Sequence, residues 1–220
     1  MYSPANAQET VFAVKAISGD EIELQNNRTL RISGIKAISK EAKDYLDELS
    51  QNKKLILQDA VQDRYGRTDA IATPGGTTQS IEESMLRAGL AFVYPTASGE
   101  MSKDWLAIEN AARQQKRGYW STHTDATPES AKDLIGKYAF IFGKVSHSER
   151  IKNKAYMYFG DKNSPDLKVT IAAKFLRPLK KRGLNVVESA DVSVRIRGWI
   201  RKGSNGAEVT INDAEQIESF

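Results

Sequence analysis

The chain of 220 residues has no cysteine and only two histidines, His123 and His147, which stand apart in the sequence. Without thiols it cannot form disulfide bonds, thiolate zinc sites or a cysteine nucleophile. Isolated histidines with no second ligand nearby also argue against a histidine-rich metal centre. Most redox, zinc and cysteine–histidine chemistry is therefore excluded, whereas the lack of cysteine does not distinguish the cytosol from an oxidising compartment.

Long hydrophobic runs are also missing: no apolar stretch approaches the roughly 20 residues that a membrane-spanning helix needs. With 40% hydrophobic and 27% charged residues, the composition is that of a soluble globular protein with one large domain or two smaller ones. Ala5-Asn6-Ala7 has the small-x-small pattern that precedes a signal-peptidase cut, but the charged and apolar regions expected before it are absent. This pattern slightly favours a periplasmic or secreted location, and a cytoplasmic location stays open.

Basic residues outnumber acidic ones only in the second part of the chain. Residues 1–129 contain 15 Lys/Arg and 18 Asp/Glu (15 − 18 = −3), and residues 130–220 contain 17 and 10 (17 − 10 = +7). A basic second half indicates an anionic partner. The polar stretch between the halves has no apolar periodicity and predicts a linker. The predicted organisation is a tail at 1–8, a first domain at 9–121, a linker at 122–132 and a second domain at 133–220.

Alternating apolar residues and turn signals predict that the first domain begins as a strand meander that runs into a helix. Two further strands and two helices follow, and Gly89 and Gly118 are expected to end the helices. Strands are expected at 10–17, 21–24, 28–35, 54–58 and 67–73, and helices at 39–49, 79–88 and 102–117. The predicted order is β-β-β-α-β-β-α-α.

The second domain is predicted to hold five strands, with one helix between the third and the fourth. The strands are expected at 138–146, 155–159, 168–171, 192–199 and 207–211, and the helix at 173–182. This order fits a small Greek-key barrel of the oligonucleotide/oligosaccharide-binding (OB) type.

Five segments of the first domain carry a family resemblance. They are Ser-Gly-Asp-Glu-Ile-Glu-Leu (18–24), Leu-Arg-Ile-Ser-Gly-Ile-Lys-Ala (30–37), Asp-Arg-Tyr-Gly-Arg (63–67), Leu-Arg-Ala-Gly-Leu-Ala-Phe-Val-Tyr-Pro (86–95) and Ala-Arg-Gln-Gln-Lys-Arg-Gly-Tyr-Trp (112–120). In this order and spacing they resemble the staphylococcal-nuclease-like (thermonuclease) family over residues 10–120. The resemblance implies an OB barrel with extra helices. We therefore expect a β-rich α+β protein of two OB-type five-stranded barrels, the first with nuclease-like helices.

Active members of this family hydrolyse DNA and RNA phosphodiesters with calcium, which two aspartates ligate beside a glutamate base and two phosphate-binding arginines. The resemblance implies that Arg31 and Arg67 match the two arginines and that Asp20 matches the first metal ligand. The segment 34–39 departs from the pattern. Lys36 stands in place of the second calcium aspartate, and Ser39 stands in place of the glutamate base.

Both replacements predict a loss of catalytic function, the first through calcium binding and the second through the general base. At an effective dielectric constant of about 20, two positive charges ~4 Å apart repel by roughly 4 kcal/mol, and a divalent ion is repelled about twice as strongly. Serine cannot act as a carboxylate base, and losing a general base typically forfeits ~10²- to 10⁴-fold in rate. We therefore predict negligible calcium-dependent nuclease activity and no bound cofactor.

Three alternatives to this interpretation stay open. Glu41 lies two positions beyond Ser39 and could replace the base after a local slip, although it matches the start of a helix. Lys36 could substitute for the metal as an electrostatic stabiliser. Arg31 and Arg67 could serve structure instead of phosphate binding by pairing with acids, since arginine suits both purposes. The acids proposed for such pairs are Asp20, Glu21 and Asp63.

In the second domain, cations interleave with aromatic residues on two expected strands. Tyrosines at period two could stack bases on one face while lysines hold phosphates. The nucleic-acid-binding candidates are Lys152, Lys154, Tyr156, Tyr158, Arg195, Arg197, Trp199 and Arg201. On the second of these strands, the three arginines and the tryptophan are expected to alternate to one face. The opposing interpretation is that the aromatic residues fill the barrel or face the first domain.

Together these observations predict a non-catalytic binding or scaffold protein, with single-stranded nucleic acid or an acidic protein surface as its partner. A calcium-dependent phosphodiesterase with a rearranged site is one alternative, in which calcium would be the cofactor. A structural subunit of a protein complex is another. Fold alone does not decide among them.

Overall fold

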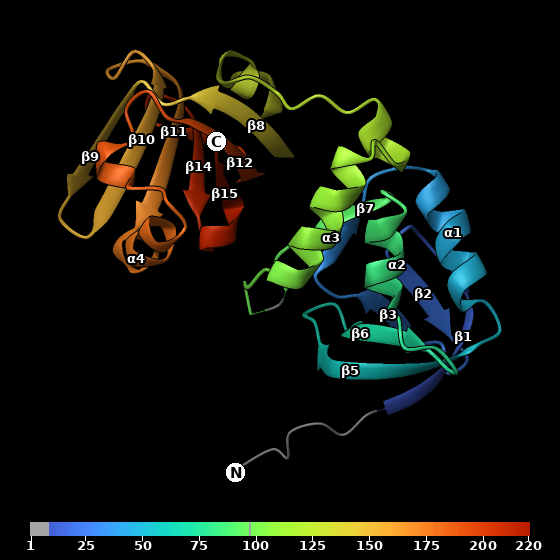
Figure 1. The fold of residues 1–220 in the computed structure, drawn as a ribbon. Helices are drawn as coiled ribbons and strands as arrows, with labels where there is room; N and C mark the ends of the chain where they lie inside the picture. Colours follow the sequence, from blue (N-terminus) through green and yellow to red (C-terminus); the bar gives the residue numbers. More distant parts are fainter. Residues whose placement is uncertain (1–8, 97) are drawn as a thin grey trace, which may run out of the picture. The chain divides into compact units, whose positions relative to one another are not determined.

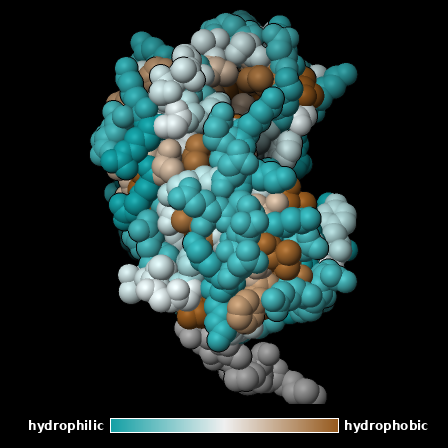
Figure 2. All heavy atoms as spheres, turned by 90° about the vertical axis from the view of Figure 1, so that its right-hand side faces the viewer, coloured by the Kyte–Doolittle hydropathy of each residue, from teal (hydrophilic) through white to brown (hydrophobic). Residues whose placement is uncertain are grey.

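A computed structural model describes residues 9–96 and 98–220 and divides the chain into two compact units, Met1–His123 and Thr124–Phe220 (Figure 1). The Ala5-Asn6-Ala7 pattern lies outside the described residues. Among the helices that are described, none combines the length and apolar character that crossing a membrane requires. On the face drawn in Figure 2, apolar residues form small separate patches among hydrophilic ones.

The first unit is built around a closed five-stranded barrel with the strand order β1-β2-β3-β6-β5. Its elements are β1 (Glu9–Ala16), β2 (Glu21–Leu24), β3 (Thr29–Ile32), β4 (Ile35–Ala37), α1 (Glu41–Ser50), β5 (Lys54–Gln62), β6 (Thr68–Pro74), α2 (Ile81–Arg87), β7 (Ala91–Val93), α3 (Lys103–Gln114) and a 3-10 helix at Gly118–Ser121. β3 and β6 run parallel, and the other barrel pairs run antiparallel. The predicted β-rich α+β fold with a five-stranded barrel is thus confirmed for this unit.

The barrel closes because its strands alternate apolar and polar residues. Ile22, Leu30, Ile32, Leu55 and Leu57 have no exposed surface and fill the interior. α1, α2 and α3 lie on one side of the barrel (Figure 1), and their apolar residues continue the same core. The helices and strands predicted from sequence are present here, and the structure adds β4 and β7, which pair with each other.

Gly89 ends α2 for a steric reason as well as a conformational one. Its φ is +69°, and a Cβ at this position would lie 2.2 Å from the carbonyl oxygen of Arg117. Only glycine lets the two backbones approach so closely in the left-handed conformation. This contact anchors the end of α3 and the following 3-10 helix to the end of α2.

The second unit contains two sheets, with the orders β13-β14-β11-β10-β9 and β15-β12-β8. Its strands and helix are β8 (Tyr138–Lys144), β9 (His147–Ile151), β10 (Lys154–Gly160), β11 (Pro165–Ala172), α4 (Ala173–Lys181), β12 (Ser193–Trp199), β13 (Arg201–Gly203), β14 (Gly206–Ile211) and β15 (Ile217–Ser219). Short 3-10 helices lie at Pro128–Leu134, Val186–Glu188 and Ala214–Gln216. The expected second five-stranded barrel is therefore not confirmed.

The added strands explain this difference. β9 and β15 fall outside the segments in which the sequence predicted strands, and the hairpin between β9 and β10 turns at Lys152, whose φ is +55°. The chain also bends at Ile200, so that β12 pairs with β8 whereas β13 pairs with β14. Short exposed edge strands lack the apolar alternation on which strand prediction depends.

Most of the predicted linker at 122–132 belongs to the second unit. Ala126 forms a β-bridge with Ile141, and Ala131 on the first 3-10 helix of this unit is fully buried in the core. A 3-10 helix that buries only a proline and an alanine leaves no periodic apolar signal in the sequence.

Candidate functional site: the charged centre around Asp20

The Asp20 carboxylate is held by the protein's own lysine. Asp20 lies in the turn between β1 and β2, its side chain is only 6% exposed, and the Lys36 ammonium on β4 lies 2.6 Å from its Oδ2. The hydroxyl of Ser18 donates a hydrogen bond of 3.0 Å to the other carboxylate oxygen. The turn packs tightly here, since a Cβ on Gly19 would lie 2.5 Å from the Cβ of Ala37 on β4. Both carboxylate oxygens of Asp20 therefore have protein donors.

Arg67 is bonded to two carboxylates. Its Nε donates to Asp63 Oδ2 at 2.7 Å, and its Nη1 pairs with Glu21 on β2. The hydrogen bond to Asp63 raises the pKa of the Arg67 guanidinium above its usual value. Asp63 also accepts hydrogen bonds from the backbone N–H groups of Tyr65 and Arg67, which shapes the turn between β5 and β6.

Arg31 pairs with Asp69, an acid that the sequence reasoning did not single out. The two residues face each other in the parallel pairing of β3 with β6, and their charged groups lie 3.6 Å apart. Asp69 is almost fully buried. Only the pairing of two strands that are distant in sequence reveals this partner. Both arginines are therefore bound to acids, as the structural alternative for them required.

Ser39 and Glu41 lie at the start of α1. The helix begins at Glu41 with Lys40 at its N-cap, and no side chain caps it. The pKa of Glu41 is lowered, first by a hydrogen bond from its own backbone N–H and then by the Ser39 hydroxyl. Glu41 thus acts as a first-turn acid of α1. Its carboxylate is therefore hydrogen-bonded within the start of α1.

The charges of this centre nearly cancel. Four carboxylates and three cations give a formal sum of −4 + 3 = −1 over Asp20, Glu21, Asp63, Asp69, Lys36, Arg31 and Arg67. A phosphate group would therefore meet no excess of positive charge unless ion pairs first opened.

Calcium does not fit these residues. It takes six to eight oxygen ligands, largely from carboxylates, and here the carboxylates of Asp20, Glu21 and Asp63 face an ammonium or a guanidinium group. Within residues 9–96 and 98–220, no cluster of three acidic, histidine or cysteine side chains is placed to hold a metal. The Lys36 ammonium already lies 2.6 Å from Oδ2 of Asp20 and would repel a cation there.

In the second unit, β10 presents its two tyrosines on the outer face of the five-stranded sheet. Ala155, Met157 and Phe159 point into the core, whereas Tyr156 and Tyr158 are half-buried on the opposite face, with ring centroids 6.3 Å apart. The Tyr158 hydroxyl donates to Glu149 at 2.8 Å on the neighbouring strand. Burial, and then this hydrogen bond, raise the pKa of Tyr158 to about 12.

The cations around these tyrosines differ in their partners. Lys154 is exposed on the tyrosine face of β10, and Lys152 lies in the hairpin turn. Lys168 on β11 stands opposite Tyr158 and pairs with Glu208 at 2.9 Å. Arg201 on β13 stands opposite Glu208 and is exposed. The sequence reasoning missed Lys168, whose neighbours only the strand register reveals.

The prediction that the arginines of β12 and the following tryptophan form one binding face is wrong for Arg197. This guanidinium is 1% exposed, pairs with Glu218 at 2.8 Å and lies over the ring of Phe140. Arg195 also forms ion pairs, with Asp125 at 2.6 Å and with Glu218 at 2.9 Å. Glu218 comes from the neighbouring strand β15, and Asp125 comes from the segment before the first 3-10 helix of this unit, so both arginines are held by residues distant in sequence. Trp199, at the end of the strand, is 46% exposed and packs edge-on against Tyr138.

Comparisons with known proteins agree with the fold of the first unit. Residues 20–122 match the family described as "Staphylococcal nuclease homologue". The chain is 32% identical over 125 residues to an "Uncharacterized endonuclease" of Escherichia coli O157:H7, a match that covers 52% of this chain and 77% of that protein. It is 31% identical over 104 residues to a "Probable endonuclease" of Komagataella phaffii, covering 44% of this chain and 45% of the relative. The chain belongs to the staphylococcal nuclease homologue family.

Proposed function

We propose that this protein is a nuclease-family member without calcium-dependent phosphodiester hydrolysis, and that it acts by binding. The main observation behind this proposal is the 2.6 Å contact between the Lys36 ammonium and the Asp20 carboxylate. It places a permanent positive charge beside the carboxylate that matches the family's metal ligand. The pairing of Arg31 and Arg67 with acids supports the same conclusion, because both guanidinium groups are already neutralised.

The remaining groups cannot replace what is missing. Hydrolysis of a phosphodiester needs a base to activate water and positive charge that stabilises the transition state. Ser39 supplies no carboxylate, and Glu41 is hydrogen-bonded within the start of α1. Lys36 is neutralised by Asp20, which leaves it little charge to offer a developing oxyanion.

The decisive experiment restores the two acids. Wild type, Lys36→Asp/Ser39→Glu and the control Lys43→Asp, which reverses the charge of an exposed residue of α1, are titrated with calcium by calorimetry. Each is also incubated with labelled single-stranded DNA and RNA in calcium or in chelator. We expect calcium binding and cleavage only in the double variant.

Two results would count against this proposal. Calcium-dependent cleavage by the wild type that is abolished by Arg67→Ala would show a working site. Absence of calcium binding in a folded Lys36→Asp/Ser39→Glu variant would contradict the role given to these two positions.

We further propose single-stranded nucleic acid as the ligand, with the outer face of the five-stranded sheet as its surface. Two half-buried tyrosines can stack bases, and the exposed Lys154 and Arg201 with the nearby Lys168 can follow the backbone. The excess of basic residues in 130–220 (17 − 10 = +7) supports an anionic partner. This ligand also agrees with the nuclease ancestry of the first unit.

Oligonucleotide binding measured across salt concentrations tests this surface. Tyr156→Ala should weaken binding about 5- to 100-fold, since stacking on one aromatic residue contributes roughly 1–3 kcal/mol. Lys154→Ala should reduce the salt dependence. Trp199→Ala is the control, because it removes an exposed aromatic residue from the other sheet. An equal loss in Tyr156→Ala and Trp199→Ala would refute the assignment.

A second candidate is a scaffold role in a protein complex, with an acidic protein surface as partner. It is favoured by the ion pairs of Glu149 with Lys162 and of Glu208 with Lys168 on the tyrosine face, because a protein surface can offer side chains of both charge signs to such pairs, whereas a nucleic acid backbone offers phosphates alone. Lack of oligonucleotide binding at low salt, with co-purification of a specific protein, would select this candidate.

We also infer that the second unit is a partly open OB-like barrel. β12 and β13 are separated only by Ile200 and act as one bent strand that joins the two sheets. After β8, the N–H of Ser146 donates to the carbonyl of Tyr158 on β10 at 2.8 Å, which links the sheets at another point. OB barrels bind oligonucleotides across their central strands, in keeping with the proposed surface.

A further inference from the structure

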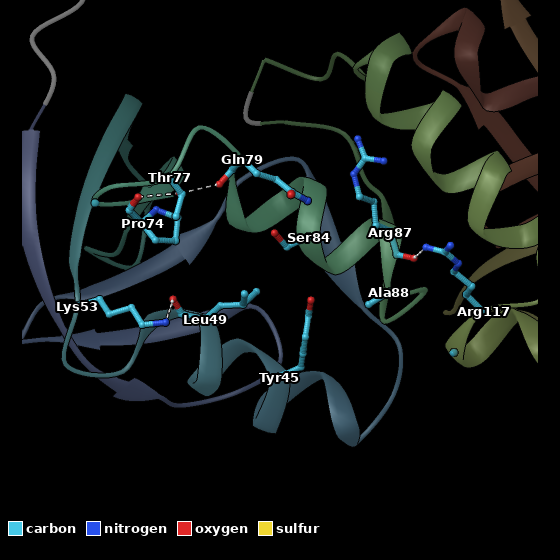
Figure 3. Close-up of a pocket in the computed structure, with 12 residues that line it drawn as sticks. Tyr45, Leu49, Lys53, Pro74, Thr77, Gln79, Ser84, Arg87, Ala88 and Arg117 are labelled. Atoms are coloured by element: carbon cyan, nitrogen blue, oxygen red, sulfur yellow. Dashed lines mark hydrogen bonds between the residues drawn. The ribbon is translucent and has the colours of Figure 1, made fainter.

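The first unit contains a cleft of about 810 Å³ between α1, α2 and the loop that follows β6 (Figure 3). None of its lining residues belongs to the charged centre around Asp20, Arg31 and Arg67. Part of its wall is apolar and comes from Leu49, Pro74, Ala88 and the ring of Tyr45. Figure 3 shows Tyr45 of α1 pointing toward Ser84 of α2 across this space. The cleft is therefore formed by packed helices and a loop, and it is accessible to a ligand.

Three cations line the cleft: Lys53, Arg87 and Arg117. In the described part of the chain, none of them pairs with a carboxylate. Lys53 donates to the carbonyl oxygens of Glu48 and Leu49, and Arg117 donates to that of Arg87. No acidic residue is among those lining the cleft, although residues 1–129 carry a net charge of 15 − 18 = −3. Uncompensated positive charge around an apolar wall complements an anionic, partly apolar ligand.

The positions of the cations restrict the ligand further. In Figure 3, Lys53 lies at one end of the labelled residues, whereas Arg87 and Arg117 lie together at the other end. A nucleic acid strand would need a continuous row of cations and aromatic residues that can stack bases. Here Tyr45 is the one aromatic residue among those lining the cleft, and its ring packs against the core. Separated cations with apolar surface between them instead suit a chain with carboxylates at both ends of an apolar stretch.

We propose that this cleft docks a short acidic peptide segment of a partner protein, with carboxylates at Lys53 and at Arg87 and Arg117 and apolar side chains against Leu49 and Pro74. This proposal holds whether or not the first unit hydrolyses phosphodiesters. It gives the first unit a binding role separate from the tyrosine face of the second unit.

The test uses the full chain and a labelled peptide of sequence Glu-Glu-Leu-Ala-Leu-Ala-Glu-Glu, followed by fluorescence anisotropy and NMR. A peptide with Gln for every Glu and a thymidine oligonucleotide of similar length are the comparison probes. Arg87→Ala/Arg117→Ala removes two cations from the cleft. Lys40→Ala/Lys43→Ala removes two exposed cations from the other end of α1 and serves as the charge-matched control.

We expect the acidic peptide to bind in a salt-dependent manner and to shift the resonances of Tyr45 and Ser84. Arg87→Ala/Arg117→Ala should weaken it about five- to twenty-fold, because each exposed ion pair contributes up to about fivefold in affinity. The control variant should keep wild-type affinity. Equal binding of the Gln peptide, equal loss in both variants, absence of shifts at Tyr45 and Ser84, or displacement of the peptide from the cleft by the oligonucleotide would each overturn the proposal.

Discussion

Glu82 provides the most quantitative prediction from this structure. It lies on α2 with no exposed surface, and its Oε1 accepts a hydrogen bond of 3.1 Å from the backbone N–H of Ala72 on β6. Burial raises the pKa of Glu82 to about 8 from an ordinary value of 4.5. At neutral pH the folded protein therefore keeps a proton on this carboxyl group that the unfolded chain releases.

The sign of the pH dependence follows from this difference. The stabilising contribution is fully present below pH 4.5 and is lost as the pH rises through about 8. At about 1.4 kcal/mol per unit of pKa, a difference of about 3.5 units corresponds to a fall of at most about 5 kcal/mol in the free energy of unfolding. Glu82→Gln retains an acceptor for Ala72 and does not ionise, so it should remove this dependence.

Urea unfolding at pH 5, 6.5 and 8 measures the effect. A Trp199→Phe background leaves Trp105 and Trp120, both in the first unit, as the fluorescence reporters. The free energy of unfolding of the background protein should fall across this range, whereas that of the Glu82→Gln variant should stay nearly constant. Parallel pH dependences in the two proteins would refute the reasoning.

Three other substitutions test contacts described above. Lys36→Met should lower the free energy of unfolding by about 1 kcal/mol, because it leaves a buried carboxylate with one donor fewer; urea unfolding of the first unit checks this, and an unchanged free energy of unfolding would contradict the pairing. Arg197→Ala should lower the free energy of unfolding by about 2–4 kcal/mol, because it removes a buried partner of Glu218; Arg201→Ala, which is exposed, should change it by less than about 0.5 kcal/mol, and similar effects would argue against the burial of Arg197. Gly89→Ala should destabilise the first unit by more than 1 kcal/mol in thermal unfolding, because its Cβ would clash with the Arg117 carbonyl; a neutral effect would place the clash in doubt.

The first unit was predictable because its signals are local. Alternating apolar residues define the strands, and Gly89 ends a helix in the position that its backbone freedom predicts. Family motifs of five to ten residues singled out Asp20, Arg31 and Arg67 as candidates, and they led to the prediction that Lys36 and Ser39 depart from the family pattern. The second unit was less predictable, since short edge strands such as β13 and β15 carry three residues each and show no periodicity.

By itself the sequence determined which chemical groups are present, and its motifs predict two arginines and an aspartate at nuclease-family positions, with a lysine and a serine where the family has two acids. Only the tertiary structure decided which charged side chains form ion pairs with one another. Lys36 on β4 reaches Asp20 in the turn before β2, Asp69 faces Arg31 through a parallel strand pair, and Glu218 holds a buried Arg197. These contacts join residues that lie far apart along the chain, and ion pairing depends on distance and burial, neither of which local sequence patterns encode.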